Sequence, residues 1–86
     1  MNENGFEIIL RDFSEYEHLV AQIEFEGQII CQINREMGVE FLEVKFFPDF
    51  YLGVKDKEMK FPLEIFISVL EKVKILLAED ANFGAA

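Results

Sequence analysis

The sequence is poor in the residue types that most often carry out chemistry. It holds one cysteine, one histidine, two serines and no threonine among its 86 residues. A lone cysteine excludes an internal disulfide, which suits a reducing compartment. A lone imidazole makes no metal site without carboxylate or thiolate partners at ligand spacing, and no serine or cysteine stands beside it in a catalytic pattern. We therefore expect no catalytic residue, no metal site and no cofactor, and a protein that is not an enzyme.

Basic residues and long apolar runs are also scarce. Eight Lys and Arg face 17 Asp and Glu, which gives a net charge of −9. The phosphates of nucleic acids and anionic lipids repel such a chain, so we expect neither as a partner. No apolar run approaches the ~20 residues that span a bilayer. Residues 1–5 also lack the basic and apolar regions of a secretory signal, and we expect a cytoplasmic protein.

The few reactive side chains have ordinary structural interpretations. Cys31 lies in an apolar stretch, and we expect it to be a small buried apolar residue rather than a reactive thiol. His18 reads as a surface or loop histidine. Acidic residues two apart, as at 15 and 17 or at 24 and 26, share one side of an extended segment. Without a pocket around them they indicate a solvated face rather than an acid–base pair.

Apolar residues, in contrast, are plentiful and follow the alternation of strands. They form 51% of the chain, including ten Phe, and the length suits a single domain over 1–86. Residues 6–10, 19–26, 28–34 and 40–47 alternate between apolar and polar, and turn residues separate them. In the last of these segments, Leu42, Val44 and Phe46 are expected to face inward. Whether 50–60 holds a further strand, at 50–54, is left open.

The hairpin around Gly27 has a register that its apolar pattern constrains. A two-residue loop would set Phe25 against Gln28 and mix apolar and polar side chains on one face. Setting Phe25 against Ile29 keeps both faces uniform, because a one-residue slip moves every side chain to the other face. We therefore expect an odd-length loop at 26–28 or a bulge beside Gly27. The same register pairs the other inward residues, Ile23 with Cys31 and Ala21 with Ile33.

One amphipathic helix is expected after the strands. Pro62 suits the first helical position and Glu64 complements the helix dipole. The helix should run to about Glu79, with 80–86 as a flexible tail. Its apolar stripe comprises Leu63, Phe66, Ile67, Leu70, Val73 and Leu77. The expected fold is therefore two-layer α+β, in which an antiparallel meander of three to five strands packs against one C-terminal helix.

Acidic residues concentrate in the first half of the chain. Residues 1–43 hold ten acids and two arginines, whereas the rest hold seven acids and six lysines. Alternation places much of this charge on the outer face of the sheet, where Val20, Ile30, Phe41 and Phe47 interrupt the polar residues. Four aromatic residues also lie within 46–51. They either seal the edge of the core or form an apolar patch rimmed by acids, which is typical of a protein interface.

Three segments resemble small immunity proteins of bacterial polymorphic-toxin and contact-dependent growth inhibition systems. They are Glu-Gly-Gln at 26–28, Phe-Leu-Glu-Val-Lys-Phe-Phe at 41–47 and Lys-Phe-Pro-Leu-Glu-Ile-Phe at 60–66. The resemblance implies a cytoplasmic protein that binds a cognate toxin domain and blocks its active site. Toxins of this kind are often basic nucleases, including tRNases. An acidic inhibitor suits them because complementary electric fields speed encounter.

This hypothesis assigns roles to two sets of residues. The attractive field is expected from Glu15, Glu17, Glu24, Glu26, Glu36, Glu40 and Glu43. The expected aromatic anchors are Phe47, Phe50 and Tyr51, because binding energy concentrates in buried aromatic residues. An alternative function stays open, in which the chain is a structural or self-associating subunit, such as a homodimer, or a small-ligand-binding domain of a larger assembly.

Overall fold

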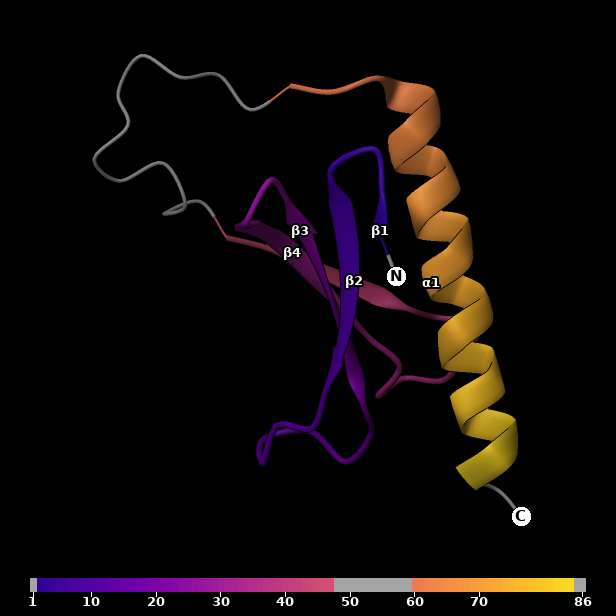
Figure 1. The fold of residues 1–86 in the computed structure, drawn as a ribbon. Coiled ribbons are helices and arrows are strands. Elements are labelled where there is room, and N and C mark those ends of the chain that lie inside the picture. The colour runs from indigo at the N-terminus through magenta and orange to yellow at the C-terminus, as the bar shows by residue number, and fades with distance from the viewer. Residues whose placement is uncertain (1, 48–59, 85–86) are drawn as a thin grey trace.

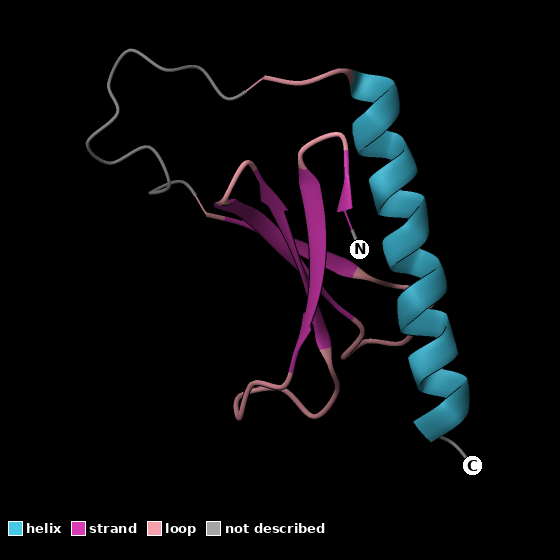
Figure 2. Ribbon diagram, viewed as in Figure 1, coloured by secondary structure: helices cyan, strands magenta, loops and turns pink. Residues whose placement is uncertain are grey.

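The structure, a computed structural model, describes residues 2–47 and 60–84 of the chain. A five-stranded antiparallel meander in the order β1-β2-β3-β4-β5 forms one layer and a single helix the other, so the fold is two-layer α+β as expected (Figures 1 and 2). The expected strand at 50–54 lies outside the described residues. The elements are β1 (Asn2–Glu3), β2 (Phe6–Arg11), β3 (Val20–Phe25), β4 (Gln28–Asn34), β5 (Glu43–Phe46) and α1 (Leu63–Gly84).

The hydrophobic core lies between the sheet and one side of α1. On the helix, Val69, Val73 and Leu77 recur every fourth position and are each at most 1% exposed. Burial of these side chains against the sheet is the main source of stability for such a small domain. The sheet contributes to the same buried cluster Phe6, Ile8, Ala21, Ile23, Ile30, Cys31 and Ile33.

An aromatic cluster joins the start of α1 to the sheet. The ring of Phe6 is 1% exposed, and its centroid lies 4.7 Å from that of Phe25 and 4.8 Å from that of Phe61. Phe66 completes the cluster at 5.9 Å from Phe6. Most of these rings meet tilted or edge to face, the arrangement that aromatic quadrupoles favour.

The buried side of α1 is rotated from the expected stripe. Val73 and Leu77 are buried as expected, but Leu63 and Ile67 are 67% and 42% exposed. Val69, outside the expected stripe, is instead buried. The helix has apolar residues of its own on several sides, including the exposed Ile75. The helical period alone therefore does not show which side meets the sheet.

Both ends of α1 are held by identifiable contacts. The carbonyl of Pro62 accepts a hydrogen bond from the Phe66 amide at 3.2 Å, so the helix begins where the proline predicts. The helix then continues to Gly84, and residues 80–84 of the expected flexible tail are helical. Asp80 accepts a hydrogen bond from Arg35 Nη2 at 2.9 Å, and this ion pair ties the last turns to the end of β4.

The β3–β4 hairpin combines a two-residue turn with a bulge. Glu26 and Gly27 have φ of 51° and 85°, as in type I′ turns, and Phe25 pairs with Gln28. The expected pairing of Phe25 with Ile29 is therefore wrong. The expected pairs Ile23–Cys31 and Ala21–Ile33 are confirmed, because the register shifts between Ile23 and Glu24.

The bulge changes the faces on which two isoleucines lie. Ile30 has no partner on β3, and Ile29 lies opposite Glu24, on the outer face of the sheet. Ile30 is 4% exposed and belongs to the core, although alternation alone predicts the reverse for both residues. The Ile30 carbonyl accepts a hydrogen bond from the Phe47 amide at 3.1 Å, which joins the bulge to the end of β5.

The helix leaves β5 largely uncovered. Val44 and Phe46 lie opposite Ile33 and Cys31, so they share the helix-facing side as expected. They are nevertheless 50% and 56% exposed, because α1 packs over β2 and β3. Leu42, which was also expected to face inward, is partly buried against the core.

Cys31 is a core residue without reactive character. Its side chain is fully buried between the sheet and α1. Desolvation by this burial raises the pKa of the Cys31 thiol to about 11, so the thiol stays protonated at neutral pH. The sequence-based interpretation of Cys31 as a small buried hydrophobe is confirmed.

Candidate protein-binding surface

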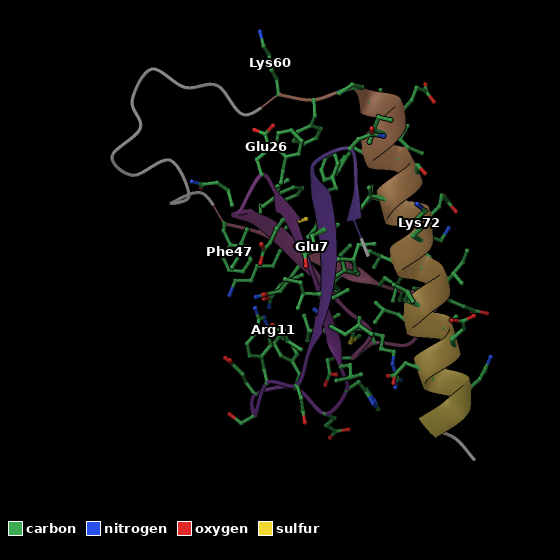
Figure 3. All side chains as sticks on the ribbon, in the orientation of Figure 1. Glu7, Arg11, Glu26, Phe47, Lys60 and Lys72 are labelled. Carbon is green, nitrogen blue, oxygen red and sulfur yellow. The ribbon has the colours of Figure 1, made fainter. Side chains whose placement is uncertain are left out.

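The outer face of the sheet, which points away from α1, carries a transverse row of two acids and two apolar side chains. Glu7 on β2 lies directly opposite Glu24 on β3, and Glu24 lies opposite Ile29 on β4. Phe47 continues the row beyond β4, because its backbone N–H donates a hydrogen bond to the Ile30 carbonyl. We call Glu7, Glu24, Ile29 and Phe47 the acidic–aromatic row. Figure 3 shows Phe47 on the side of the sheet away from α1.

The row contains a like-charge pair that opposes folding. Directly opposed residues of antiparallel strands have Cβ atoms about 4.5–5.5 Å apart, and like charges there destabilise a sheet. Within residues 2–47 and 60–84, no lysine or arginine forms a salt bridge with Glu7 or Glu24. Glu26 in the adjoining turn is exposed and adds a third acid. This end of the outer face therefore holds a concentrated negative charge that is not needed for the fold.

Phe47 is partly buried and has a cation beside it. The Lys45 ammonium lies 5.8 Å from the centroid of the Phe47 ring, within range of a cation–π contact. This contact holds the ring over the outer face at the end of the acidic–aromatic row. The two other expected anchors, Phe50 and Tyr51, lie outside the described residues.

The centre of the outer face is a buried polar layer rather than an open acidic surface. Gln22, Gln32 and Asn34 are only 5–6% exposed. Arg11 Nε donates to Gln22 Oε1 at 2.7 Å, and Gln32 Nε2 donates to the hydroxyl of Tyr16 at 3.2 Å. Tyr16 belongs to the loop between β2 and β3, so this loop closes over one end of the face.

The expected acidic residues fall into separate places. Glu24 and Glu26 lie at the acidic–aromatic row and its adjoining turn. Glu15 and Glu17 lie in the β2–β3 loop, and Glu40 lies in the β4–β5 connection. Glu43 lies on the outer face of β5, opposite Asn34. Glu7, the partner of Glu24, was missed, although its outward position in the first strand follows from the same alternation.

Glu36 fixes the β2–β3 loop through its carboxylate. Its two carboxylate oxygens accept hydrogen bonds from the backbone amides of Glu17 at 3.0 Å and His18 at 3.1 Å. The Glu36 amide in turn donates to Asn34 Oδ1 at 3.1 Å. The alternation of apolar and polar residues cannot predict this role, because the contact joins two loops that come together only in the folded sheet.

The Glu36→Gln variant is therefore expected to loosen the loop. Replacing the carboxylate weakens two charge-assisted hydrogen bonds, which should cost about 1 kcal/mol. Amide hydrogen exchange at Glu17 and His18 should accelerate, while exchange in β3 stays unchanged. Glu40→Gln removes another exposed charge in the same connection and serves as the control. Equal exchange at Glu17 and His18 in both variants would contradict this role of Glu36.

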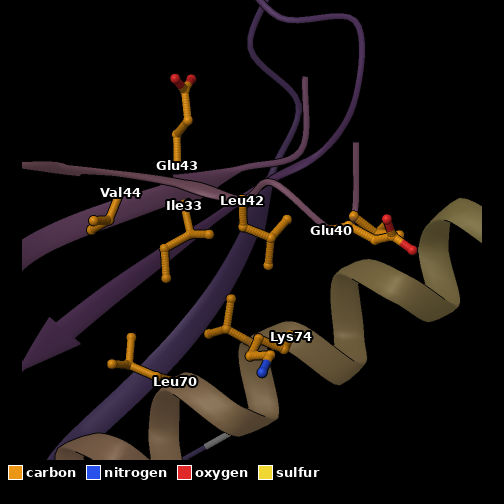
Figure 4. Close-up of a pocket in the computed structure, with 9 residues that line it drawn as sticks. Ile33, Glu40, Leu42, Glu43, Val44, Leu70 and Lys74 are labelled. Carbon is orange, nitrogen blue, oxygen red and sulfur yellow. The ribbon is translucent and has the colours of Figure 1, made fainter. Parts of the chain in front are cut away.

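An apolar groove separates β5 from α1 on the helix-facing side. It encloses about 250 Å³, and Ile33, Leu42 and Val44 point from the sheet toward Leu70 of the helix (Figure 4). Glu43 points away from it. The groove exists because α1 does not reach β5, and alternation cannot predict that. Its other lining residues are Val39, Glu40, Val73 and Lys74.

Neither metal-binding nor membrane-spanning features are found in the described part of the chain. No group of three or more His, Cys, Asp or Glu side chains within 2–47 and 60–84 could hold a metal ion. The one helix described there is not apolar enough over a sufficient length to cross a bilayer. Comparisons with family models, with curated proteins and with solved structures found no match for this chain.

Proposed function

We propose that this chain is a non-catalytic module that binds a basic protein through the acidic–aromatic row. The observation that carries the proposal is the pair of opposed carboxylates of Glu7 and Glu24, with which no lysine or arginine of residues 2–47 and 60–84 forms a salt bridge. Two carboxylates that repel each other in the free protein gain most when a cation is brought between them. Phe47 and Ile29 extend the same row with apolar area, which gives the combination of charged rim and aromatic anchor that protein interfaces use.

The partner class that fits best is a cognate toxin domain of the basic nuclease type, which the chain neutralises as an immunity protein. A nuclease surface is positively charged because it must attract phosphates. The net charge of −9 steers such a protein toward this chain and raises the association rate at low ionic strength. The carboxylates of Glu7, Glu24 and Glu26 then compete with phosphate oxygens for the same lysine and arginine donors.

Co-purification with the product of the neighbouring gene tests this proposal. The C-terminal domain encoded immediately upstream is expressed with this chain, and the mixture is resolved by size-exclusion chromatography at about 0.1 M and about 0.5 M salt, where screening differs strongly. We expect the two proteins to elute together at the lower salt concentration and to separate in part at the higher one, and we expect cleavage of tRNA by the upstream domain to be blocked in the complex. An upstream domain that neither binds this chain nor loses its activity would overturn the proposed partner.

A further inference from the structure

The edge of β5 that faces away from β4 carries exposed apolar side chains. Within residues 2–47 and 60–84, β4 is the strand that pairs with β5, and none lies along its other edge. Val44 and Phe46 are half exposed on the helix-facing side of this edge. An exposed apolar edge strand is a template for pairing with another strand.

The backbone groups that point to this edge can be identified. The Phe47 amide donates to the Ile30 carbonyl, so the amide of Phe47 points toward β4. Backbone groups of successive residues point to alternate sides of a strand. The N–H and C=O groups of Lys45 and Glu43 therefore also point toward β4, and those of Val44 and Phe46 point away from it, to the other edge.

We propose that a second copy of this chain pairs with β5 antiparallel, with Val44 on the two-fold axis. This register is self-complementary in charge, because Glu43 lies opposite Lys45 of the second copy, and Lys45 lies opposite its Glu43. On the helix-facing side Val44 meets its own copy, and Leu42 lies opposite Phe46. The outward backbone groups of Val44 fit a directly hydrogen-bonded pair across the axis.

The neighbouring registers are less favourable. A shift by one residue sets apolar side chains opposite charged ones on the wrong faces. With Lys45 on the axis, two lysines face each other, and with Glu43 on the axis, two glutamates do. Like charges directly opposite destabilise a strand pair, so the sequence 42–46 selects the register with Val44 on the axis.

This dimer goes beyond the proposed toxin-binding function and joins the two chains along β5, beside the Phe47 end of the acidic–aromatic row. A two-fold axis perpendicular to the sheet places both outer faces on one side, so both acidic–aromatic rows point in the same direction. Pairing at β5 leaves Glu7 and Glu24 accessible, because they lie on β2 and β3. Lys45 also contacts the Phe47 ring, so Val44→Pro, which leaves both Lys45 and the row in place, is the variant that separates the dimer from the toxin complex.

A charge-exchange experiment tests the register. In the proposed register, position 43 of each copy lies opposite position 45 of the other. Lys45→Glu therefore places two negative charges opposite each other at both of these pairs, and Glu43→Lys places two positive charges there. Each single variant should weaken the dimer roughly tenfold or more, because both symmetric pairs become repulsive. An equimolar mixture of the two variants restores opposite charges at every pair and should form a heterodimer, measured by sedimentation velocity with one chain labelled.

Two further variants keep the test independent of folding defects. The Glu43→Lys, Lys45→Glu double variant keeps the complementarity and should dimerise like the unmodified chain. Val44→Pro removes an outward amide without removing a bond to β4, so it should keep the circular dichroism of the fold and lose the dimer. A chain that stays monomeric at a concentration of about 1 mM overturns the proposal, because a dimer with a higher dissociation constant is too weak to matter. Single charge variants that dimerise undiminished overturn it equally.

Discussion

The Phe6→Ala variant is expected to lose about 3–5 kcal/mol of the free energy of unfolding, the usual cost of truncating a buried phenylalanine. Phe6 is 1% exposed and contacts rings from both layers, so its removal leaves a cavity that neither the sheet nor α1 can fill. A domain of this length has roughly 4–13 kcal/mol in total. Urea denaturation followed by circular dichroism should show a variant that is unfolded or close to it.

The matched control is Phe41→Ala. The Phe41 side chain is 68% exposed, so its removal takes little apolar area out of the core and should change stability by less than about 0.5 kcal/mol. Phe6→Leu provides an intermediate case, because leucine refills part of the volume and should recover most of the loss. If Phe6→Ala and Phe41→Ala unfold at the same urea concentration, the aromatic cluster does not hold α1 to the sheet.

The strand order and the helix could be predicted because each depends on a local pattern. Alternation placed β2, β3 and β4 to within about a residue at each end, and Pro62 with Glu64 marked the start of α1. The meander then follows from short turns between consecutive strands. In this chain local preference and global fold agree over most of the described residues.

The errors arise where a contact between distant residues decides the outcome. The bulge at Ile30 makes a two-residue turn compatible with the pairing of the apolar residues beyond it. Strict alternation of apolar and polar residues cannot predict such an unpaired residue. The exposure of Val44 depends on how far α1 extends across the sheet. The helical state of Asp80 accompanies its ion pair with Arg35, 45 positions away in the sequence.

The candidate site was predicted in part for the same reason. Alternation identified Glu24 and Phe47 as outward residues, and both lie in the acidic–aromatic row. It also assigned Glu36 to the same field, although that side chain holds the β2–β3 loop. The distinction between a solvated acid and an acid that accepts backbone hydrogen bonds requires the tertiary fold.

The Glu24→Gln variant is expected to be more stable than the unmodified chain and to bind its partner more weakly. Removing one charge of the Glu7–Glu24 pair relieves a repulsion between directly opposed strands, worth about 0.2–1 kcal/mol of folding stability. The same change takes a carboxylate from the center of the proposed interface. Loss of one member of a desolvated charge pair costs about 2 kcal/mol or more, which is about 30-fold in Kd.

Opposite signs in the two measurements separate a binding role from a structural one. Urea denaturation gives the stability of the free chain, and surface plasmon resonance with the proposed partner, the C-terminal domain encoded upstream, gives Kd. Glu79→Gln on α1 makes the same change in net charge at an exposed site away from the row, and should slow association only slightly. If Glu79→Gln weakens binding as much as Glu24→Gln does, the partner senses only total charge, and the acidic–aromatic row is not the binding surface.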